Sequence, residues 1–326
     1  MASGQPDVAL LDFLTSRFTY HTREQWRERI SEQRILVNTV VVSADRILTG
    51  GDEVEFIVHD IAEPPVSFDV RIVFEDYDVM VINKPANLPC HPAGRYFNHT
   101  LWAYLKTRHC LESPILVNRL DRETSGLVLV AKHTKAEACC RAQFVQRRVI
   151  KRYIVLVEGP FPETLQASGW LMPDPESGVH KRRRFVLVTP EPGTRNTQPE
   201  VPDSEWAETD FRLLGTVNGV SEVEATLHTG RLHQIRATLS SLGYPVVGDK
   251  LYGPDPMIFV RFCKDSLTDE DRRRLRMARQ ALHAMELDFQ HPSTGAMMHF
   301  EAPLPEDMAA VVASPFVISS AVGCKT

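Results

Sequence analysis

The sequence predicts an α+β fold built on a mixed, largely antiparallel sheet, with a small module in front of it. Short apolar runs bounded by Gly, Asp and Pro turns recur along the chain, as in VRIVFED, VMVINKP and VEATLH. Few helical patterns separate these strands, so the regular strand–helix alternation of a parallel α/β sheet is missing. The length of 326 residues leaves room for about two domains.

The first 60 residues are expected to form a module of two helices and a hairpin. The apolar residues of these helices are three or four positions apart: Leu10, Leu11 and Leu14 in the first, Trp26 and Ile30 in the second. Thr22 can cap the second helix, and the runs ILVNTVVV and TGGDEVEFIV are typical of strands. Two prolines, Pro64 and Pro65, indicate an extended linker over residues 61–67.

Residues 68–308 are expected to form the main domain. A hairpin over VRIVFED and VMVINKP comes first, then strands at ILVNRLD, LVLVAK and YIVLV. A helix with a capping box of Thr134 and Glu137 is predicted between the last two, and its apolar stripe is Ala138, Ala142, Val145 and Val149. Residues 173–204 are rich in Pro, Glu, Gly and Asp, which indicates an irregular excursion.

The remainder of this domain is predicted to be a strand, a helix and a final hairpin. VEATLH alternates as a strand, and Leu232, Ile235, Leu239 and Leu242 mark the buried face of the following helix. His233 and Arg236 fall on a different face of that helix. MELDF and MMHFEAP then form the hairpin, and residues 309–326 form a tail of small and apolar residues.

Composition and charge favour a soluble protein of the cytoplasm. Hydrophobic residues make up 43% and charged residues 24%, which are ordinary globular values. We expect no membrane partner, because no signal peptide and no apolar run of about 20 residues is present. Six Cys without a CxxC pair indicate reduced thiols. The net charge of −5 means that a nucleic acid would be held by local basic patches.

Several common catalytic motifs are absent. The sequence contains no GxGxxG, P-loop, HExxH or GxSxG, so nucleotide hydrolysis, dinucleotide chemistry and zinc proteolysis lose support. The His and Cys residues are scattered without the spacing of metal ligands. We therefore expect neither a metal nor a cofactor.

Polar residues gather in three short segments beside apolar strands, at 119–126, 151–153 and 229–236. Loops on a rigid sheet are where catalytic groups concentrate. Each residue also has a structural interpretation: Asp121 as a turn cap, Tyr153 as a half-buried strand aromatic, and Arg236 on a solvated helix face. Taken singly, these structural interpretations are the more common ones.

The order of these segments resembles one family. The stretches RLDRETSGLVLVAK, KRYIVLV, TGRLHQIR, GYPVVGDKLYG and LHAMELDFQHPSTG together closely resemble the RluA-type RNA pseudouridine synthases, from about Val70 to Pro305. Residues 10–58 resemble a degenerate alpha-L RNA-binding module, in which Thr39 replaces the usual Gly after the VN pair. The family usually has His where this chain has Asn118.

The resemblance implies the pseudouridine synthase fold and the isomerisation of uridine in structured RNA, without a cofactor. In that reaction the N1–C1′ bond breaks, the uracil rotates, and C5 bonds to C1′. The expected partner is a tRNA or rRNA stem-loop, and we expect a monomer without an obligate protein partner.

The resemblance also implies roles for single residues. Asp121 would be the catalytic carboxylate, Arg236 would pair with it, and Tyr153 would pack against the base and help to remove the C5 proton. Arg119 would help to occupy the space left by the flipped nucleotide. The other expected substrate contacts are Lys84, Arg231, His233 and Gln234.

Elementary chemistry fits these residue types. A carboxylate can attack a sugar carbon or take a neighbouring proton, and either role requires it to be ionised. Burial raises a carboxyl pKa, whereas an arginine within about 4 to 6 Å lowers it by roughly 1 to 3 units. Two basic patches can follow an RNA backbone. They contain Arg147, Arg148, Lys151 and Arg152 in the first, and Lys181 and Arg182 in the second.

Two other function classes remain to be weighed. One is a non-catalytic RNA-binding protein on the same scaffold, which the joint presence of Asp121, Tyr153 and Arg236 disfavours. The other is a glycoside hydrolase that pairs Asp121 with Glu123. Two carboxylates in one turn have no evident reason to lie about 5 to 9.5 Å apart across a scissile bond.

Overall fold

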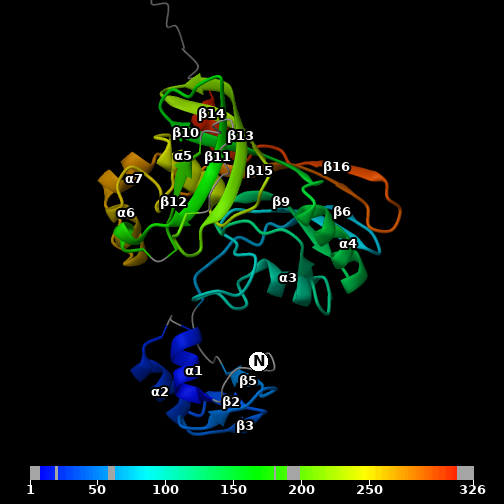
Figure 1. The fold of residues 1–326 in the computed structure, drawn as a ribbon, viewed down its shortest axis with the longest axis vertical. Helices are drawn as coiled ribbons and strands as arrows, with labels where there is room; N and C mark the ends of the chain where they lie inside the picture. Colours follow the sequence, from blue (N-terminus) through cyan, green and yellow to red (C-terminus); the bar gives the residue numbers. More distant parts are fainter. Residues whose placement is uncertain (1–7, 19–20, 58–62, 180, 189–198, 314–326) are drawn as a thin grey trace, which may run out of the picture. The chain divides into compact units, whose positions relative to one another are not determined.

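The computed structural model describes residues 8–18, 21–57, 63–179, 181–188 and 199–313 (Figure 1). The chain divides into two compact units, Met1–Pro65 with Pro92–Asn98, and Val66–His91 with His99–Thr326. Parts of the predicted linker, of the predicted excursion and of the predicted tail lie outside the described residues. No helix of the described ranges is long and apolar enough to cross a membrane.

The N-terminal unit has the predicted order of elements. Helices α1 (Leu10–Arg17) and α2 (Arg23–Ser31) enclose Trp26, which is fully buried. Thr22 caps α2 through a reciprocal capping box with Gln25, as the sequence predicts for its N-terminus. The strands of this unit are β1 (Val8–Ala9) paired with β4 (Ile47–Leu48), and β2 (Ile35–Val37) between β3 (Val40–Val41) and β5 (Val54–Phe56).

The turn between β2 and β3 shows the effect of the replaced glycine. Asn38 has a φ of +52° and Thr39 a φ of +67°, so both residues are left-handed. A β-branched residue is unfavourable there, whereas glycine adopts this conformation freely. The Asn38 side chain supports the turn by donating to Asp52 (2.7 Å) and accepting from the backbone N–H of Glu53 (2.9 Å).

The larger unit is built on one mixed sheet, which has eleven strands in the described ranges. In spatial order its main path is β12 (Arg183–Leu187), β11 (Thr164–Pro173), β13 (Glu205–Val217), β14 (Val220–Leu227), β10 (Ile150–Glu158), β15 (Leu282–Gln290), β9 (Ser125–Ala131), β7 (Val79–Lys84) and β6 (Arg71–Glu75). Two further strands pair beside this path, β16 (Met297–Glu301) on β15 and β8 (Ile115–Leu116) on β9. The β9–β15 pair is parallel and the other pairs are antiparallel, which confirms the predicted fold class.

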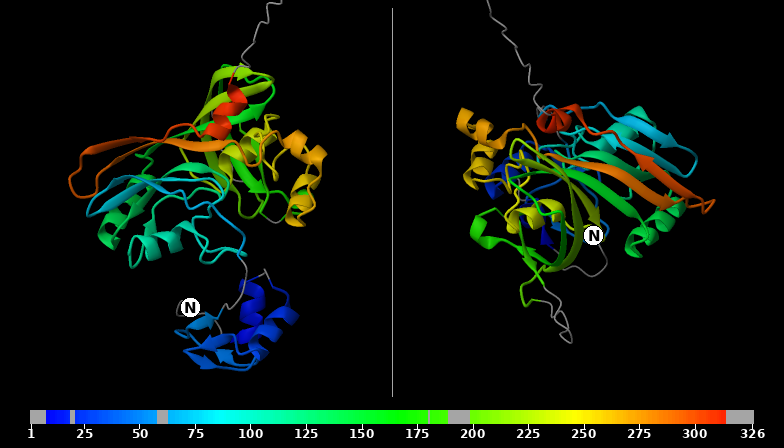
Figure 2. Two further views of the ribbon diagram at one scale, coloured as in Figure 1. Left: turned by 180° about the vertical axis from the view of Figure 1, so that it is seen from behind. Right: turned by 90° about the horizontal axis from the view of Figure 1, so that it is seen from above.

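The helices of this unit lie beside different parts of the sheet (Figures 1 and 2). Their bounds are α3 (Leu101–Arg108), α4 (Thr134–Val145), α5 (Gln234–Ser241), α6 (Met257–Cys263), α7 (Asp269–Leu275), α8 (Glu306–Val312) and the 3-10 turn η1 (Pro175–Ser177). Helix α4 packs on β9 and β15, and α5 packs on β11 and β12. Helix α8 continues past the predicted domain boundary at residue 308.

Strand β9 is the centre of the core. Val128 and Val130 pack into one apolar cluster, and Leu127 and Leu129 into another, so the strand is buried along its whole length. A strand buried on both faces has a continuous apolar sequence, as LVLV does. The loop at 119–124 enters β9 directly, so it is anchored to a fully buried strand.

Two local predictions were wrong. Helix α4 buries Ala136, Cys140 and Gln143 instead of the predicted stripe, and Val145 is 78% exposed. Its cap is His133, whose side chain accepts from the backbone N–H of Ala136, because the helix begins at Thr134 itself. The predicted excursion at 173–204 contains β12, which pairs with β11 and buries one aromatic side chain, Phe185.

Candidate active site

The three polar segments meet around one pocket of about 70 Å³. Asp121 lies in the turn before β9, Tyr153 lies on β10, and Arg236 lies in the first turn of α5, which follows β14. Strands β9, β15, β10 and β14 are successive neighbours in the sheet, so residues far apart in sequence converge. The remaining predicted residues that line the pocket are Arg119, Arg231, His233 and Gln234.

A guanidinium with two carboxylates forms the centre of the site. Arg236 Nη1 donates to Asp121 Oδ2 over 2.7 Å, as the resemblance implies. The same guanidinium is held on its other side by Asp249, through Nε (2.7 Å) and Nη2 (2.9 Å). The Asp249 side chain is 0% exposed and that of Asp121 is 29% exposed. Asp249 therefore holds Arg236 from the protein interior, whereas Asp121 faces the pocket.

The electrostatics keep Asp121 ionised. Burial acts to raise the pKa of Asp121, but the charge of Arg236, with smaller contributions from His233 and Gln280, outweighs burial and holds the pKa below its usual value. Gln280 Nε2 lies 3.3 Å from Asp121 Oδ2. Burial, followed by the charge of Arg236, lowers the pKa of His233 to about 4, so this imidazole is neutral at pH 7.

Asp249 and Tyr252 fix the orientation of Arg236. Asp249 Oδ1 also accepts from the backbone N–H groups of Leu251 (2.9 Å) and Tyr252 (3.0 Å). The Tyr252 ring lies 5.0 Å from the guanidinium carbon, and its hydroxyl is 3.0 Å from His233 Nδ1. Sequence reasoning assigned no role to these two residues, although both lie in the quoted stretch GYPVVGDKLYG.

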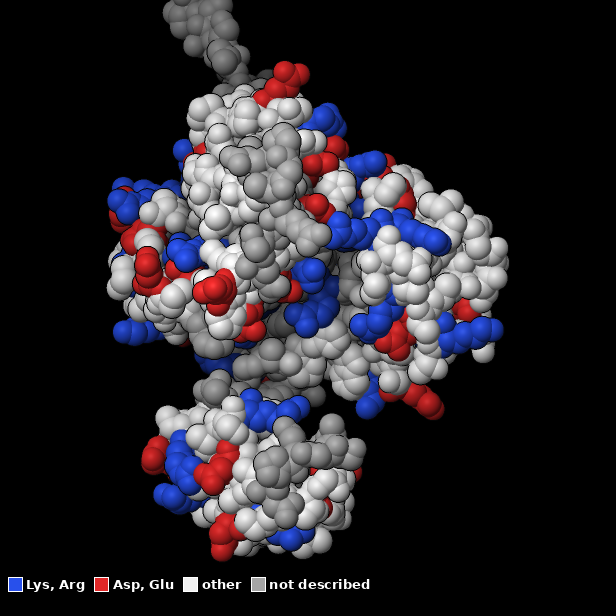
Figure 3. Space-filling model, in the orientation of Figure 1, with Lys and Arg blue, Asp and Glu red and all other residues white. Residues whose placement is uncertain are grey.

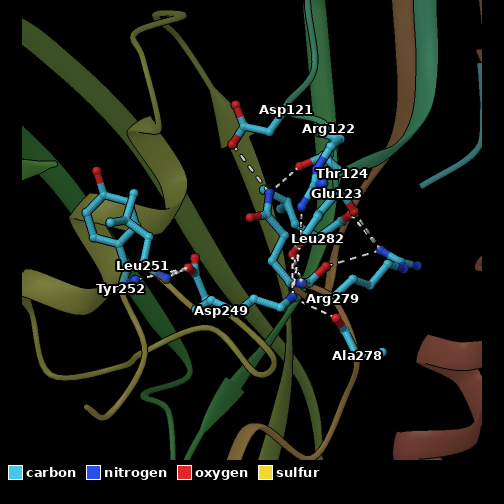
Figure 4. A network of polar contacts seen from close by, with 12 residues as sticks. Asp121, Arg122, Glu123, Thr124, Asp249, Leu251, Tyr252, Ala278, Arg279 and Leu282 are labelled. Carbon is cyan, nitrogen blue, oxygen red and sulfur yellow. Dashed lines mark hydrogen bonds and ion pairs between the residues drawn. The ribbon is translucent and has the colours of Figure 1, made fainter. Parts of the chain in front are cut away.

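A second polar network supports the loop that carries Asp121 (Figure 4). Glu123 accepts from Lys250 Nζ (2.9 Å) and from the backbone N–H of Gln280 (3.3 Å). Gln280 also donates to Thr124 Oγ1 over 2.6 Å. Glu123 is thus committed to bonds within the protein, which further disfavours a hydrolase that uses it as a second carboxylate.

Two predicted substrate contacts have structural roles instead. Lys84 is fully buried, and its Nζ donates to the carbonyls of Pro85 (2.9 Å) and Leu88 (2.9 Å); burial lowers the pKa of its amine to about 8. Gln234 uses its whole amide inside the protein, since it accepts from Thr229 and Arg231 and donates to Glu208 and Thr209. Neither side chain has a free polar group to offer a ligand.

Asn118 forms hydrogen bonds within the protein, whereas Arg119 is available to a ligand. The Asn118 side chain continues the pairing along β9, because it accepts from the backbone N–H of Leu129 (2.7 Å) and donates to the carbonyl of Leu127 (3.3 Å). Arg119 lines the pocket and makes no side-chain hydrogen bond or ion pair with any described residue. Its guanidinium is available to a ligand.

The predicted basic patches separate into paired and available residues. Arg152 forms an ion pair with Glu286, and Arg182 with Asp174 (3.2 Å), so these two have internal roles that differ from the prediction. Lys151 lies beside the loop of Gly230, and burial lowers the pKa of Lys151 to about 8. Arg148 is exposed, Arg147 pairs with Glu208 at the surface, and Lys181 lines a second pocket.

Lys and Arg side chains gather in a hollow of the larger unit (Figure 3). The hollow lies between the strands β11 to β14 and the part of the unit that holds α3 and α4. A local basic surface of this kind can attract RNA although the whole chain is acidic.

Two groups of side chains in the described ranges have the composition of metal sites. They are Asp76, Asp78 and His291 in one, and Glu286, Asp288 and His299 in the other. In the first, His291 Nδ1 accepts from the backbone N–H groups of Ser293 and Thr294, which places its proton on Nε2, facing Asp76. A protonated nitrogen binds no metal, so this group acts as a hydrogen-bonded clamp between two turns.

Comparisons with known proteins show the family of the chain. Residues 78–241 match the family described as RNA pseudouridylate synthase. The chain is 32% identical to the uncharacterized RNA pseudouridine synthase YlyB of Bacillus subtilis, over 92% of this chain and 91% of that protein. It is 31% identical to the ribosomal large subunit pseudouridine synthase D of Nitrosomonas europaea, over 89% of this chain and 79% of that protein.

The fold has a solved counterpart. The structure of human RNA pseudouridylate synthase domain containing 1 matches with a TM-score of 0.55 and 25% identity, over 74% of this chain and 86% of that one. Together with the family match and the relatives, this confirms the predicted class of enzyme. The chain belongs to the RluA-type family of RNA pseudouridine synthases, which isomerise uridine to pseudouridine in RNA.

Proposed function

We propose that this protein isomerises specific uridines of large-subunit ribosomal RNA, with Asp121 as the catalytic carboxylate. The observation that carries the proposal is the position of Asp121 in the pocket where the three polar segments meet, with Arg236 holding it at 2.7 Å. The guanidinium never loses its charge near neutral pH, so the carboxylate stays ionised in a partly buried place.

The proposed reaction balances within one nucleotide. The N1–C1′ bond breaks while the ionised Asp121 either bonds to the sugar carbon or takes a neighbouring proton. The uracil then rotates in the pocket and its C5 bonds to C1′, while Asp121 releases the sugar carbon or returns the proton that it took. C5 then loses its proton through Tyr153, the proton finally passes to water, and N1 gains one, so the composition of the RNA is unchanged. No redox partner is required.

Tyr153 has two proposed tasks. Its ring lines the pocket, and stacking on an aromatic ring is worth about 1 to 3 kcal/mol per base. Burial and the nearby charge of Asp121 raise the pKa of Tyr153 above its usual value, so the phenol keeps its proton at neutral pH. It therefore takes the C5 proton only as it passes its own proton to an acceptor, and Asp121 is the charged acceptor in the same pocket.

RNA would be held around the pocket by cations that the protein leaves available. Arg119 stands in the pocket wall, and Lys151 stands beside the loop that carries Arg231. Taking a base out of its stack costs a few kcal/mol, and the cost is smaller in a loop, so a stem-loop is the expected target.

The choice of ribosomal RNA comes from the relatives. Proteins named ribosomal large subunit pseudouridine synthase D in Nitrosomonas europaea and Vibrio cholerae are each 31% identical to this chain, over 89% of its length. Transfer RNA is the other structured RNA that such a pocket can accept, and it forms the second arm of the test.

The test is tritium release from RNA labelled at C5 of uridine. Transcripts of large-subunit ribosomal RNA and of tRNA are incubated with the native protein and with Asp121→Asn. We expect release from the ribosomal transcript with the native protein alone. Release from tRNA alone would replace the proposed substrate, and equal release by Asp121→Asn would refute the role of the carboxylate. Tight binding without release from either RNA would favour a non-catalytic RNA-binding protein.

A further inference from the structure

A second pocket, of about 370 Å³, adjoins the catalytic pocket. Asp121, His233 and Arg236 line both pockets, so these three side chains form the wall between them. The proposed reaction uses only the smaller pocket. A volume of this size lies within the range of pockets that hold small organic ligands, which is about 300 to 1,000 Å³.

The second pocket exposes mostly apolar surface, and charged side chains of both signs are among its lining residues. Helix α6 contributes Phe259 and Phe262, both partly exposed, and Leu251 and Val179 add further apolar surface. Aromatic rings of this kind stack on nucleobases without regard to sequence. The lining is therefore suited to a flat ring and poorly suited to a highly polar ligand.

Among the described residues of the lining, one cation is left available. Lys250 and Arg122 both form ion pairs with Glu123, and both lie over the Phe262 ring, at 5.0 Å and 5.6 Å. Lys181 makes no side-chain hydrogen bond or ion pair with any described residue. A ligand that combines a flat ring with a negative group would satisfy both the rings and this amine.

We propose that the second pocket receives the base of a nucleotide beside the target uridine, stacked on Phe259, with a backbone phosphate against Lys181. This inference rests on the proposed function, because the shared wall places the pocket next to the nucleotide that reacts. Single-stranded loops present unstacked bases that proteins bind in this way. The pocket thereby reads the neighbourhood of the uridine, and so contributes to the choice of site.

The experiment combines a protein change with an RNA change. The substrate is the stem-loop of ribosomal RNA around the modified uridine, labelled at C5 of that uridine, with either a natural or an abasic nucleotide at each flanking position in turn. The proteins are the native form, Phe259→Ala, Phe259→Trp and a control, Met257→Ala, which changes an exposed residue of the same helix outside the pocket.

With the natural stem-loop, Phe259→Ala is expected to lower kcat/KM by about 5- to 150-fold, the range that corresponds to one stacked base. Phe259→Trp should restore most of the loss, and Met257→Ala should behave as the native protein does. One abasic position should cost the native protein a similar factor and cost Phe259→Ala almost nothing further, because both changes remove the same contact. Thermal unfolding of each variant shows whether folding is intact.

Two results would overturn the inference while leaving the proposed function in place. One is native kcat/KM in a folded Phe259→Ala variant. The other is a loss from every abasic position that is the same in Phe259→Ala as in the native protein. Failure of the proposed function itself looks different, because the native protein would then release no tritium from the natural stem-loop.

Discussion

Arg236 is paired with the carboxylates of Asp249 and Asp121, and we expect the substitution of Asp by Asn to have different effects at the two positions. At Asp249 it should mainly reduce stability, and at Asp121 it should mainly reduce activity. Asp249 is fully buried, makes two bonds to the guanidinium and accepts from two backbone N–H groups. An amide there removes a charge and points a donor at other donors. Asp121 is partly exposed and makes one bond to the guanidinium, which keeps its bidentate partner when Asp121 is changed.

The magnitudes follow from this difference. Removal of one partner of a buried ion pair costs about 3 to 5 kcal/mol, and Asp249→Asn belongs at the lower end because Arg236 retains Asp121. Asp121→Asn should change the free energy of unfolding by about 1 to 2 kcal/mol, because it weakens only the hydrogen bonds from Arg236 and Gln280 at a partly exposed carboxylate. Its rate of tritium release should fall at least about 100-fold, since the reacting carboxylate is lost.

The pH dependence gives a further check. Burial acts to raise the pKa of Asp249, but Arg236 outweighs it, so the folded-state pKa lies below the unfolded value of about 3.9. A lowered carboxyl pKa stabilises the fold above that unfolded value, and the stabilisation is lost as the pH falls through the folded-state pKa. Asp249→Asn should therefore show a shallower loss of stability below about pH 4 than the native protein.

Urea unfolding followed by circular dichroism, together with tritium release, measures both effects. The reasoning is refuted if Asp249→Asn unfolds within about 1 kcal/mol of the native protein at pH 7, since a buried partner would then have been removed without its expected cost. Greater destabilisation by Asp121→Asn than by Asp249→Asn would also contradict it.

Three further predictions concern neighbouring features. Tyr153→Phe should keep its RNA affinity in filter binding but slow single-turnover tritium release by about 10²- to 10⁴-fold, because the ring remains and the hydroxyl is lost; an unchanged rate would exclude the proton relay. Gly126→Ala should lose about 2 to 6 kcal/mol in urea unfolding, because Gly126 has a φ of +116° and an added Cβ would lie 2.2 Å from the Ala284 carbonyl oxygen. Gly215→Ala, which meets no atom within 4 Å, is the control, and similar losses in both variants would show that crowding is not the cause. Lys151→Gln should reduce the slope of log affinity against log salt by about 1, and the native advantage should shrink above about pH 8, where an amine with a pKa of about 8 loses its charge; an unchanged slope would mean that Lys151 touches no phosphate.

Strands were more predictable than helix faces in this chain. Central strands such as β9 have continuous apolar sequences, and the hairpins are bounded by turn residues. The apolar pattern and the turn residues therefore predict the same strands. Helix α4 contains apolar and small residues on several faces, and the sequence does not show that Ala136 and Cys140 are the ones that meet the sheet. The choice between faces is made by tertiary packing.

The site was predictable where a residue faces the pocket and less so where it supports one that does. Asp121, Tyr153 and Arg236 stand in stretches that resemble the family, and they meet as expected. Lys84 and Gln234 lie in similar stretches, but their polar groups form hydrogen bonds with backbone and side-chain groups of the protein. No local sequence pattern reveals these bonds. The pairing of Arg236 with the buried Asp249 likewise depends on how the chain turns after α5, which no local sequence pattern reveals.

The parallel pairing of β9 with β15 also has a consequence for the order in which the protein matures during synthesis. Ser125 and His283 are hydrogen-bonded at 2.9 Å across 158 positions of sequence. Contacts of such long range form late, because the chain loses conformational entropy when the loop closes, before the contacts can stabilise the fold. A nascent chain that has emerged from the ribosome only as far as α7 lacks both this strand pair and Gln280. The first two-thirds of the polypeptide therefore contain the proposed catalytic residues Asp121 and Tyr153, but the site is not yet assembled. Catalytic competence arrives only when the final third of the molecule docks.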